Sequence, residues 1–502
     1  MDANRHPYEK APCGVRSRPT LRRVPPLPVG KGRAESKRLA SFILVVCGAL
    51  QIAGCALNTP PDAGEIRGQA LPNLAVPSQW SAKGGAAGGV ANNWLAAFND
   101  PKLDAVVFEA IENNPDLRVA AARVEQAAGY VRLSGATLYP QVNLLARGGG
   151  PMGGDSSGLQ GAGIIANWEV DLWGRVRAGR EAAQLQYVSA ELDTEYARQS
   201  IAALVAKSWF LATEARLQKA ITEDMMRSAE RIVGLAQDRT RIGKGDEYDV
   251  TLAQANLQTY RDAVQQLDLS YRQALRALEA LIGRYPAAAV DVPPRLAATP
   301  GPVPVGMPSE LLERRPDIVA AERRVAVAFY RTEEAKAARL PRISLVASVS
   351  SVSSELFVLK DRDNPVWSAG ASVLAPIYLG GALQSQVEIR TAEQKQAVAE
   401  YGRVGARAFG EVENALSSGF TLEERVAILT RAVAENERAL ELANVRYRVG
   451  SGDLRAVQQQ QLVVYAARTA LLRVQGEQLV QRVNLHLALG GNFETPAVAA
   501  SR

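Results

Sequence analysis

Apolar residues recur at helical spacing through the last quarter of the chain. A first stripe steps by four, three and four residues, at Leu422, Val426, Leu429 and Val433. A second stripe repeats every seven residues, at Val457, Val464 and Leu471. Such narrow stripes are typical of helices that pack along a coiled-coil-like seam. The pattern therefore predicts two helices that lie against each other.

Both predicted helices are long. No proline occurs between Pro376 and Pro496, and the main interruption is the sequence Val-Gly-Ser-Gly-Asp at residues 449–453. Its glycines can adopt positive φ, and its Ser and Asp can cap a following helix. The first helix, from about residue 383 to residue 448, would be about 100 Å long at 1.5 Å per residue. An ordinary bundle helix would explain the stripe but not this length.

The same plan occurs earlier in the chain. A proline-free span from Met152 to Tyr285 contains a glycine turn at residues 241–246. Residues 239–246 align without gaps on residues 446–453. Three further segments match in the same order: 114–117 with 315–318, 138–144 with 339–345, and 281–283 with 488–490. We infer a tandem duplication, because several matches in one order are improbable by chance.

Alternating apolar and polar residues predict a pair of strands in each half. The segments are residues 142–147 and 164–171 in the first half, and 343–350 and 367–373 in the second. Their lengths approach the roughly ten residues of a tilted membrane strand. Glu169 and Asp171 fall on the polar face, and we expect them to line a channel. A soluble hairpin packed on helices would show the same alternation.

Four strands cannot close a barrel. An open edge in lipid would leave backbone groups without hydrogen-bond partners, so strands in a membrane require further copies of the chain. Three copies would supply twelve strands. We therefore expect a homotrimer if the strands lie in a membrane.

Charge changes the picture at the amino terminus. The chain carries a formal charge of +6, but residues 1–54 hold ten Lys or Arg and three Asp or Glu, and the remainder holds 48 basic against 49 acidic residues. The basic excess thus belongs to the leader, and no basic stripe with stacking aromatics remains, so no nucleic-acid partner is expected.

The leader ends in an apolar segment too short to span a bilayer comfortably, followed by the sequence Ile-Ala-Gly-Cys at residues 52–55. It resembles a bacterial lipobox, in which Cys55 receives a lipid and becomes the first residue. Ala56 in place of Asp implies an anchor in the outer membrane. The alternative is a buried helix with an incidental cysteine.

We expect a signal segment at 1–54 and a lipidated, extended arm at 55–91. The expected remainder is a first repeat at 92–290, a linker at 291–307, a second repeat at 308–492 and a tail at 493–502.

Catalytic chemistry is not expected. The chain has no P-loop and no cluster of Cys and His, and its two histidines are His6 and His486. We predict neither an enzyme nor a cofactor or metal site, and interpret the acidic pairs on helices as solvated faces.

Several motifs together resemble the bacterial outer membrane factor family, the TolC-like channels, and within it the lipoproteins of the NodT and OprM type. The motifs are residues 94–103, 114–117, 171–175, 311–318 and 378–381, together with the lipobox. The resemblance implies a mainly α fold with a β-barrel part. In this fold the long helical hairpins of three chains form a periplasmic α-barrel, which a twelve-stranded outer-membrane β-barrel continues, with four strands per chain.

The resemblance also implies a function and its partners. The chain would be the outer-membrane channel of a tripartite efflux system, passively exporting drugs or other toxic small molecules. An inner-membrane pump of the resistance-nodulation-division type and a periplasmic adaptor would deliver them. The alternatives are a channel for type I protein or peptide secretion, and a periplasmic coiled-coil lipoprotein that forms no channel.

The matching motifs also indicate which residues of this chain would have the functional roles known in the family. The turns Gly243, Lys244, Gly245 and Gly450, Ser451, Gly452 would be the periplasmic tips where the adaptor docks. Family members commonly carry Leu and, four residues later, Asp just after the second turn, and these residues constrict the closed pore. Arg455 and Gln459 stand at those places here. Gln459 cannot form an acidic ring, so Asp246 and Asp453 are further candidates for the constriction. Alternatively, Arg455 and the neighbouring glutamines form a solvated helix face.

Overall fold

The computed structural model describes residues 58–147, 160–353 and 365–494. All of them belong to one compact unit, Leu57–Arg502. The expected signal segment and Cys55 lie outside the described residues, as does most of the expected tail. Among the helices in the described ranges, none is both long enough and apolar enough to cross a membrane.

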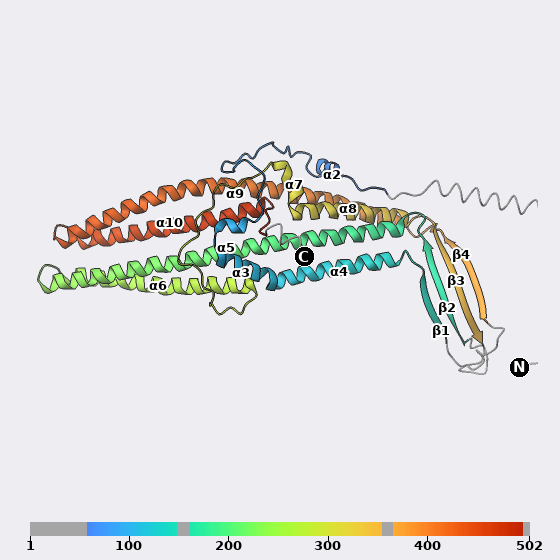
Figure 1. Cartoon of the computed structure of the whole chain (residues 1–502), viewed down its shortest axis with the longest axis horizontal. Coiled ribbons are helices and arrows are strands. Elements are labelled where there is room, and N and C mark those ends of the chain that lie inside the picture. The colour runs from blue at the N-terminus through green and yellow to red at the C-terminus, as the bar shows by residue number, and fades with distance from the viewer. Residues whose placement is uncertain (1–57, 148–159, 354–364, 495–502) are drawn as a thin grey trace, which may run out of the picture. The chain divides into compact units, whose positions relative to one another are not determined.

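The two halves have the same order of elements (Figure 1). The first half comprises η1 (Trp94–Phe98), α3 (Pro101–Asn113), α4 (Pro115–Ala136), β1 (Gln141–Arg147), β2 (Gln160–Val170), α5 (Arg175–Arg241) and α6 (Glu247–Ile282). The second half comprises η2 (Pro308–Glu310), α7 (Leu311–Arg314), α8 (Pro316–Ala337), β3 (Arg342–Ser353), β4 (Pro365–Leu374), α9 (Ala382–Arg448) and α10 (Leu454–Ala488). Helices α5 and α9 are each 67 residues long. The fold is therefore mainly helical with four strands, as expected, and it repeats once.

The strands form one antiparallel sheet in the order β1-β2-β3-β4. The register puts Trp168 opposite Leu345, and Ala347 opposite Ala369, on an apolar face. Asn143, Ile165, Ser348 and Ser368 lie in one row on the other face. This is the alternation predicted from sequence. Among the residues that the structure describes, β1 and β4 each have a neighbouring strand on one side only, so both edges of the described sheet are open.

The helices pack as two long hairpins, α5 with α6 and α9 with α10 (Figure 1). Helix α8 packs against both α5 and α9, and α4 packs against α5. One core lies under η1 and α3 and includes the buried side chains of Trp94, Phe98, Leu103, Trp209 and Phe210. A second core lies where α8 meets α9 and includes Ile318, Tyr401 and Val412. Both cores lie around the joints between the short and long helices.

The amino-terminal arm differs from the extended tether expected from sequence. Residues Ala63–Ala70 form a helix, α2, in which Ile66 is buried and the Asp62 side chain accepts a hydrogen bond from the Glu65 backbone N–H. This helix packs on α9. A cap and one buried apolar side chain stabilise eight residues that the surrounding prolines and glycines had suggested were extended.

The rest of the arm is fixed to α9 and to the linker. The Glu413 carboxylate accepts hydrogen bonds from the backbone N–H groups of Ser81 and Ala82, at 2.9 and 2.8 Å. The Trp80 ring lies 6.3 Å from that of Phe409. Ala86 forms an isolated parallel bridge with Pro304. The arm therefore docks on the second half through backbone as well as side-chain contacts.

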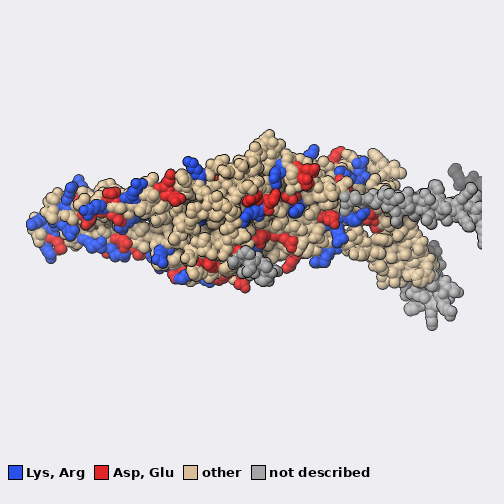
Figure 2. Space-filling model, turned by 45° about the horizontal axis from the view of Figure 1, so that its top comes forward, with Lys and Arg blue, Asp and Glu red and all other residues tan. Residues whose placement is uncertain are grey.

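Charged side chains are distributed unevenly. Figure 2 shows Lys and Arg interspersed with Asp and Glu along the helical part, whereas the surface at the strand end of the view is almost free of both. A mixed charged surface is typical of helices in water. The uncharged surface of the strands is typical of a sheet that faces lipid.

Candidate functional site

The two hairpin turns have the same backbone structure. Gly243 and Gly450 have φ values of +72° and +83°, in the left-handed region that glycine adopts without strain. In each turn the backbone N–H of the residue three positions past the end of the helix donates a hydrogen bond to a carbonyl inside the helix. These bonds run from Lys244 to Arg239 at 2.8 Å and from Ser451 to Arg446 at 3.0 Å. They are the bonds of a Schellman motif.

At the second glycine of each turn, there is little room for a side chain. A Cβ atom at Gly245 would lie 3.1 Å from Arg239 Cβ, and one at Gly452 would lie 2.9 Å from Arg446 Cβ. The predicted tip residues therefore form two closely matching turns. Lys244 and Ser451 are exposed at their ends.

Two aliphatic side chains at the tips were missed by sequence reasoning. Ile242 and Val449 precede the turns at equivalent positions of the two halves, and they are 62% and 72% exposed. They are not part of the apolar stripe, which faces the neighbouring helix. Their exposure next to a glycine turn provides an apolar contact at each tip.

The acidic candidates for the constriction serve as helix caps. The Asp246 carboxylate accepts a hydrogen bond from Asp249 N–H at 2.8 Å, and that of Asp453 accepts one from Arg455 N–H at 3.0 Å. Both carboxylates remain exposed. Burial, and after it the carboxylates of Asp246 and Asp453, raises the pKa of Asp249. The structure thus brings three carboxylates together near the tips, where the sequence had suggested two.

Two cation–π contacts join the first hairpin to the second. The Arg239 guanidinium lies 4.6 Å from the ring centre of buried Tyr447, and the Arg455 guanidinium lies 5.0 Å from that of Tyr248. Tyr248 and Arg455 occupy equivalent positions of the duplication. Sequence reasoning named Arg455 but not its aromatic partner. Gln459 is exposed on α10, one turn further along.

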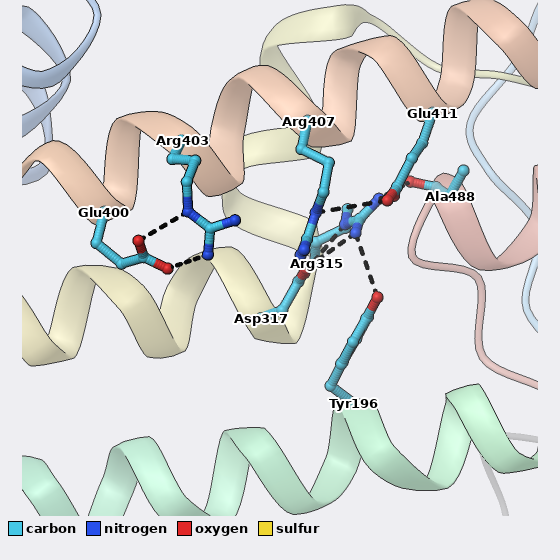
Figure 3. Close-up of polar contacts among 8 residues, drawn as sticks. All are labelled: Tyr196, Arg315, Asp317, Glu400, Arg403, Arg407, Glu411 and Ala488. Atoms are coloured by element: carbon cyan, nitrogen blue, oxygen red, sulfur yellow. Dashed lines mark hydrogen bonds and ion pairs between the residues drawn. The ribbon is translucent and has the colours of Figure 1, made fainter.

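A buried ionic cluster fixes the joint between α8, α9, α10 and α5 (Figure 3). Arg315, which is fully buried, donates to both carboxylate oxygens of Asp317 at 3.0 and 2.9 Å and to Glu411 at 2.6 Å. It also donates to the Ala488 carbonyl at 3.1 Å, and the hydroxyl of Tyr196 lies 3.5 Å away. Burial opposes the charge, but the hydrogen bonds and negative charges of Asp317 and Glu411 raise the pKa of Arg315 above its ordinary value. Arg315 therefore stays charged.

The first half has a neutral version of this joint. Asn114 stands where Arg315 stands in the second half. Its amide donates to the Leu281 carbonyl at 2.8 Å, and its side-chain oxygen accepts from Asp116 N–H at 2.8 Å. Leu281 is the counterpart of Ala488. Each half thus ties the start of α4 or α8 to the end of α6 or α10.

The carboxylates at the end of β2 are not free groups, because each has partners at the start of the helix that follows. Glu169 accepts two hydrogen bonds from Arg175, at 3.0 and 2.8 Å. Asp171 accepts from the backbone N–H groups of Val176 and Arg177, at 3.0 and 2.9 Å, and so caps α5. Strand alternation predicts the face on which these residues lie but says nothing about the helix that begins four residues later, so the sequence did not predict these partners. These groups fix the junction between sheet and helix.

Comparisons with known proteins agree with this geometry. A sequence model described as "Outer membrane efflux protein" matches residues 106–284 and 307–491. The pyoverdine export outer membrane protein OpmQ of Pseudomonas aeruginosa is 30% identical over 447 residues, which cover 86% of this chain and 94% of that protein. The cation efflux system protein CusC of Escherichia coli is 28% identical over 463 residues, which cover 89% and 99%. The solved structure of the outer-membrane channel OprN matches with a TM-score of 0.76 at 27% identity, over 84% of this chain and 99% of that one. The chain therefore belongs to the outer membrane efflux protein family and is an outer-membrane channel of an efflux system.

Proposed function

We propose that three copies of the chain form a closed channel that passively exports small molecules. A resistance-nodulation-division pump and a periplasmic adaptor deliver them. The observation that carries this proposal is the four-stranded sheet with one apolar face and two open edges. In lipid, both edges need strand partners, and β4 of one copy meets this need with β1 of the next. Relatives named for pyoverdine export and cation efflux support a small cargo.

In this proposal Cys55 carries the lipid, and the tips formed by Gly243, Lys244 and Gly245 and by Gly450, Ser451 and Gly452 dock the adaptor. The exposed side chains of Ile242 and Val449 support docking there, because they offer apolar contact beside a rigid turn. Asp246, Asp453, Arg455 and Gln459 are placed at the constriction. The contact of Arg455 with Tyr248 supports a role in holding the hairpins together when the pore is closed.

Native mass spectrometry of the mature protein extracted from membranes tests the assembly. We expect a trimer whose subunits begin at Cys55 and carry acyl chains. A monomer would contradict the shared barrel, and an unmodified amino terminus would contradict the anchor. Conductance of the purified trimer in planar bilayers then tests the channel itself.

Site-specific photo-crosslinking in cells tests the docking tips. A crosslinking amino acid at Lys244 or Ser451 should capture the adaptor, since both side chains are exposed at the turns. The same amino acid at Thr259, which is exposed on α6 away from the turn, is the matched control. Equal capture from Thr259 would argue against docking at the tips.

A further inference from the structure

A polar cleft lies where α5, α9 and α10 meet, beside the buried ionic cluster of Arg315. Its volume is about 360 Å³, which falls in the range of roughly 300–1,000 Å³ typical of sites for small molecules. Figure 3 shows Tyr196 and Glu411, which line the cleft, extending from α5 and α9 toward Arg315. The polar residues that line it come from three helices: Tyr196, Glu411, Asn414, Ser418, Gln481 and Asn484.

The cleft lies on the face of α9 opposite the amino-terminal arm. The arm contacts α9 at Phe409 and Glu413. The cleft residues of α9 are Glu411, Asn414 and Ser418. With about 3.6 residues per turn, these two sets lie on opposite sides of the helix. In the proposed channel the arm leads to the lipid anchor and so lies on the outer surface, which places the cleft on the side of the lumen.

A lysine next to this cleft has no acidic partner. The half-buried ammonium of Lys207 donates a hydrogen bond to Asn484 Oδ1 at 3.2 Å. Burial lowers the pKa of Lys207, and in the described part of the chain no carboxylate forms a salt bridge with it. By contrast, Lys219 on the same helix is paired with Asp268 at 2.6 Å. Lys207 is therefore a partly desolvated cation whose charge is not balanced locally.

Two amides extend the donor character of Lys207 into the cleft. Asn484 accepts from the ammonium, and its Nδ2 donates to Gln481 Oε1 at 3.2 Å. The carbonyl oxygens of both amides are thus already engaged. The Nε2 of Gln481 makes no hydrogen bond to any residue that the structure describes, so it is available as a donor. An ammonium and an amide N–H₂ group together favour a ligand that accepts hydrogen bonds and carries negative charge.

The carboxylates nearby do not cancel this preference. Glu411 accepts a hydrogen bond from Arg315 at 2.6 Å and forms a salt bridge with Arg407 at 3.5 Å, so its charge is balanced. Toward the carboxyl end of α5, the next carboxylate on the face of Lys207 is Glu214, two turns away. That separation is about 10 Å along the helix, close to the screening length in roughly 0.1 M salt.

We propose that this cleft binds small organic carboxylates through Lys207 and Gln481. The position of the site in the lumen rests on the proposed function. The carboxylate of the ligand supplies the partner that Lys207 lacks, and so offsets the cost of burying the ammonium. Three copies of the chain would then present three equivalent sites around one axis. Anionic cargo would be held there on its way through the helical part of the channel, whereas cationic cargo of the same shape would pass without binding.

Fluorine NMR of the purified trimer in an uncharged detergent tests the binding. The probe is 4-(trifluoromethyl)benzoate, and 4-(trifluoromethyl)benzylammonium is a cation of similar shape. Titration of empty micelles gives the background for both. We expect saturable binding of the benzoate and binding of the ammonium that is weaker by about tenfold or more. Equal binding of the two probes, or no saturable binding of the benzoate, would overturn the proposal.

Variants of two lysines on α5 locate the site. Lys207→Gln should weaken benzoate binding by about tenfold or more, because it removes the charged donor, and Lys207→Arg should retain part of the affinity. Lys219→Gln is the matched control, since it makes the same change of charge about 18 Å along the same helix and should alter binding by less than about twofold. If Lys207→Gln fails to assemble, Gln481→Leu removes the amide donor without changing the charge and should weaken binding several-fold. Unchanged binding in an assembled Lys207→Gln trimer would refute the site.

The position in the lumen has its own test. Ser418 lies in the cleft, and Cys55 is the sole cysteine after residue 54, so Ser418→Cys adds one reactive thiol when Cys55 is acylated. A bulky maleimide on this thiol should lower the conductance of the trimer in planar bilayers, and the benzoate should slow the labelling. Unchanged conductance after complete labelling would overturn the placement in the lumen. A trimer that conducts no current before labelling contradicts the proposed channel, whereas a conducting trimer that binds no benzoate contradicts the site alone.

Discussion

Arg315 and Asn114 show how a duplicated position acquires different chemistry. Both precede the proline that begins a helix, and both donate to a carbonyl at the end of a long hairpin. Asn114 does so as a neutral cap, whereas Arg315 requires Asp317 and Glu411 to balance its buried charge. Sequence comparison of the halves could find the position. It could not find Glu411, which lies on another helix 96 residues away.

Replacing Arg315 should therefore destabilise the chain strongly. Arg315→Ala leaves the buried carboxylate of Asp317 without its main partner, and removing one member of a buried pair typically costs roughly 3–5 kcal/mol. Arg315→Lys keeps the charge but loses the bidentate hydrogen bonds to Asp317, so its loss of stability should lie between those of the wild type and Arg315→Ala. Guanidinium unfolding followed by helical circular dichroism measures both. Arg403→Ala, which breaks the exposed pair with Glu400 seen in Figure 3, is the control and should change little. An equally mild effect of Arg315→Ala would refute a structural role for the cluster.

His486 makes the stability of the helical part depend on pH. The ring is 5% exposed and is stacked on Trp94 at 5.8 Å. Burial, and after it the positive charge of Arg482, lowers the pKa of His486 to about 4 from an ordinary value of 6.5. The unfolded chain therefore binds a proton that the folded chain excludes between these pH values. Stability due to this residue is full above about pH 6.5 and is lost as the pH falls toward 4.

Replacing His486 with Phe should remove that loss. The wild type is expected to lose up to about 3 kcal/mol of unfolding free energy per chain through His486 between pH 7 and pH 4. His486→Phe keeps an aromatic ring against Trp94 but cannot be protonated. Denaturant melts at pH 7, 6, 5 and 4 measure the difference between the two proteins. The other histidine of the chain, His6, is the same in both proteins, so it does not contribute to the difference between them. If the unfolding free energies of the two proteins changed with pH in the same way, the low pKa assigned to His486 would be contradicted.

At the scale of elements, sequence pattern predicted what depends on local spacing. The absence of proline and the glycine turns predicted both ends of α9 within one residue and the start of α10, and alternation located the four described strands. The failures depend on tertiary contact. Helix α2 exists because Ile66 is buried against the second half, and the role of Asp171 as the cap of α5 was not predicted. Helices α2 and α9 are more than 300 residues apart in the sequence. A local pattern cannot predict a contact over such a separation.

The docking of α2 on α9 depends on a glycine. A Cβ atom at Gly402 would lie 2.5 Å from the Ala70 carbonyl oxygen, whereas one at Gly405 would make ordinary contacts at 3.5 Å or more. Gly402→Ala should therefore displace α2 and speed tryptic cleavage after Arg67 and Lys83. Gly405→Ala lies on the same helix, should leave cleavage unchanged, and should stabilise α9 by up to about 1 kcal/mol through helix propensity. Timed proteolysis with mass spectrometry distinguishes the two, and equal cleavage rates would show that the arm does not need the close approach.

At the scale of the whole molecule, the family resemblance and the strand pattern led to the same architecture. The expected efflux channel is confirmed, and the alternative of a coiled-coil lipoprotein without a channel is not supported. The tip turns could also be predicted, because glycine spacing determines them. The contacts between the hairpins at these tips could not, since Tyr248 and Tyr447 meet their arginines across separate helices.

The two faces of the sheet should respond oppositely to the same charge. Ala369 lies on the apolar face and Ser368, its neighbour in β4, on the polar face. Ala369→Arg should cost about 2–4 kcal/mol per chain near the middle of the bilayer and reduce the amount of assembled protein in the outer membrane. Ser368→Arg should be tolerated, because its side chain reaches water. Fractionated membranes analysed on gels with and without heating measure assembly. Equal loss in both variants would contradict the assignment of the faces.

The paired contacts between the hairpins also limit how the gene can evolve. Tyr248 and Arg455 descend from one ancestral position, yet each now depends on the other being different. Gene conversion that copied one half onto the other would leave two tyrosines or two arginines facing each other, and the second pair would repel. Exchange of sequence between the halves would therefore remove this contact at the tips. A duplicated chain whose copies touch in this way is expected to keep its halves distinct.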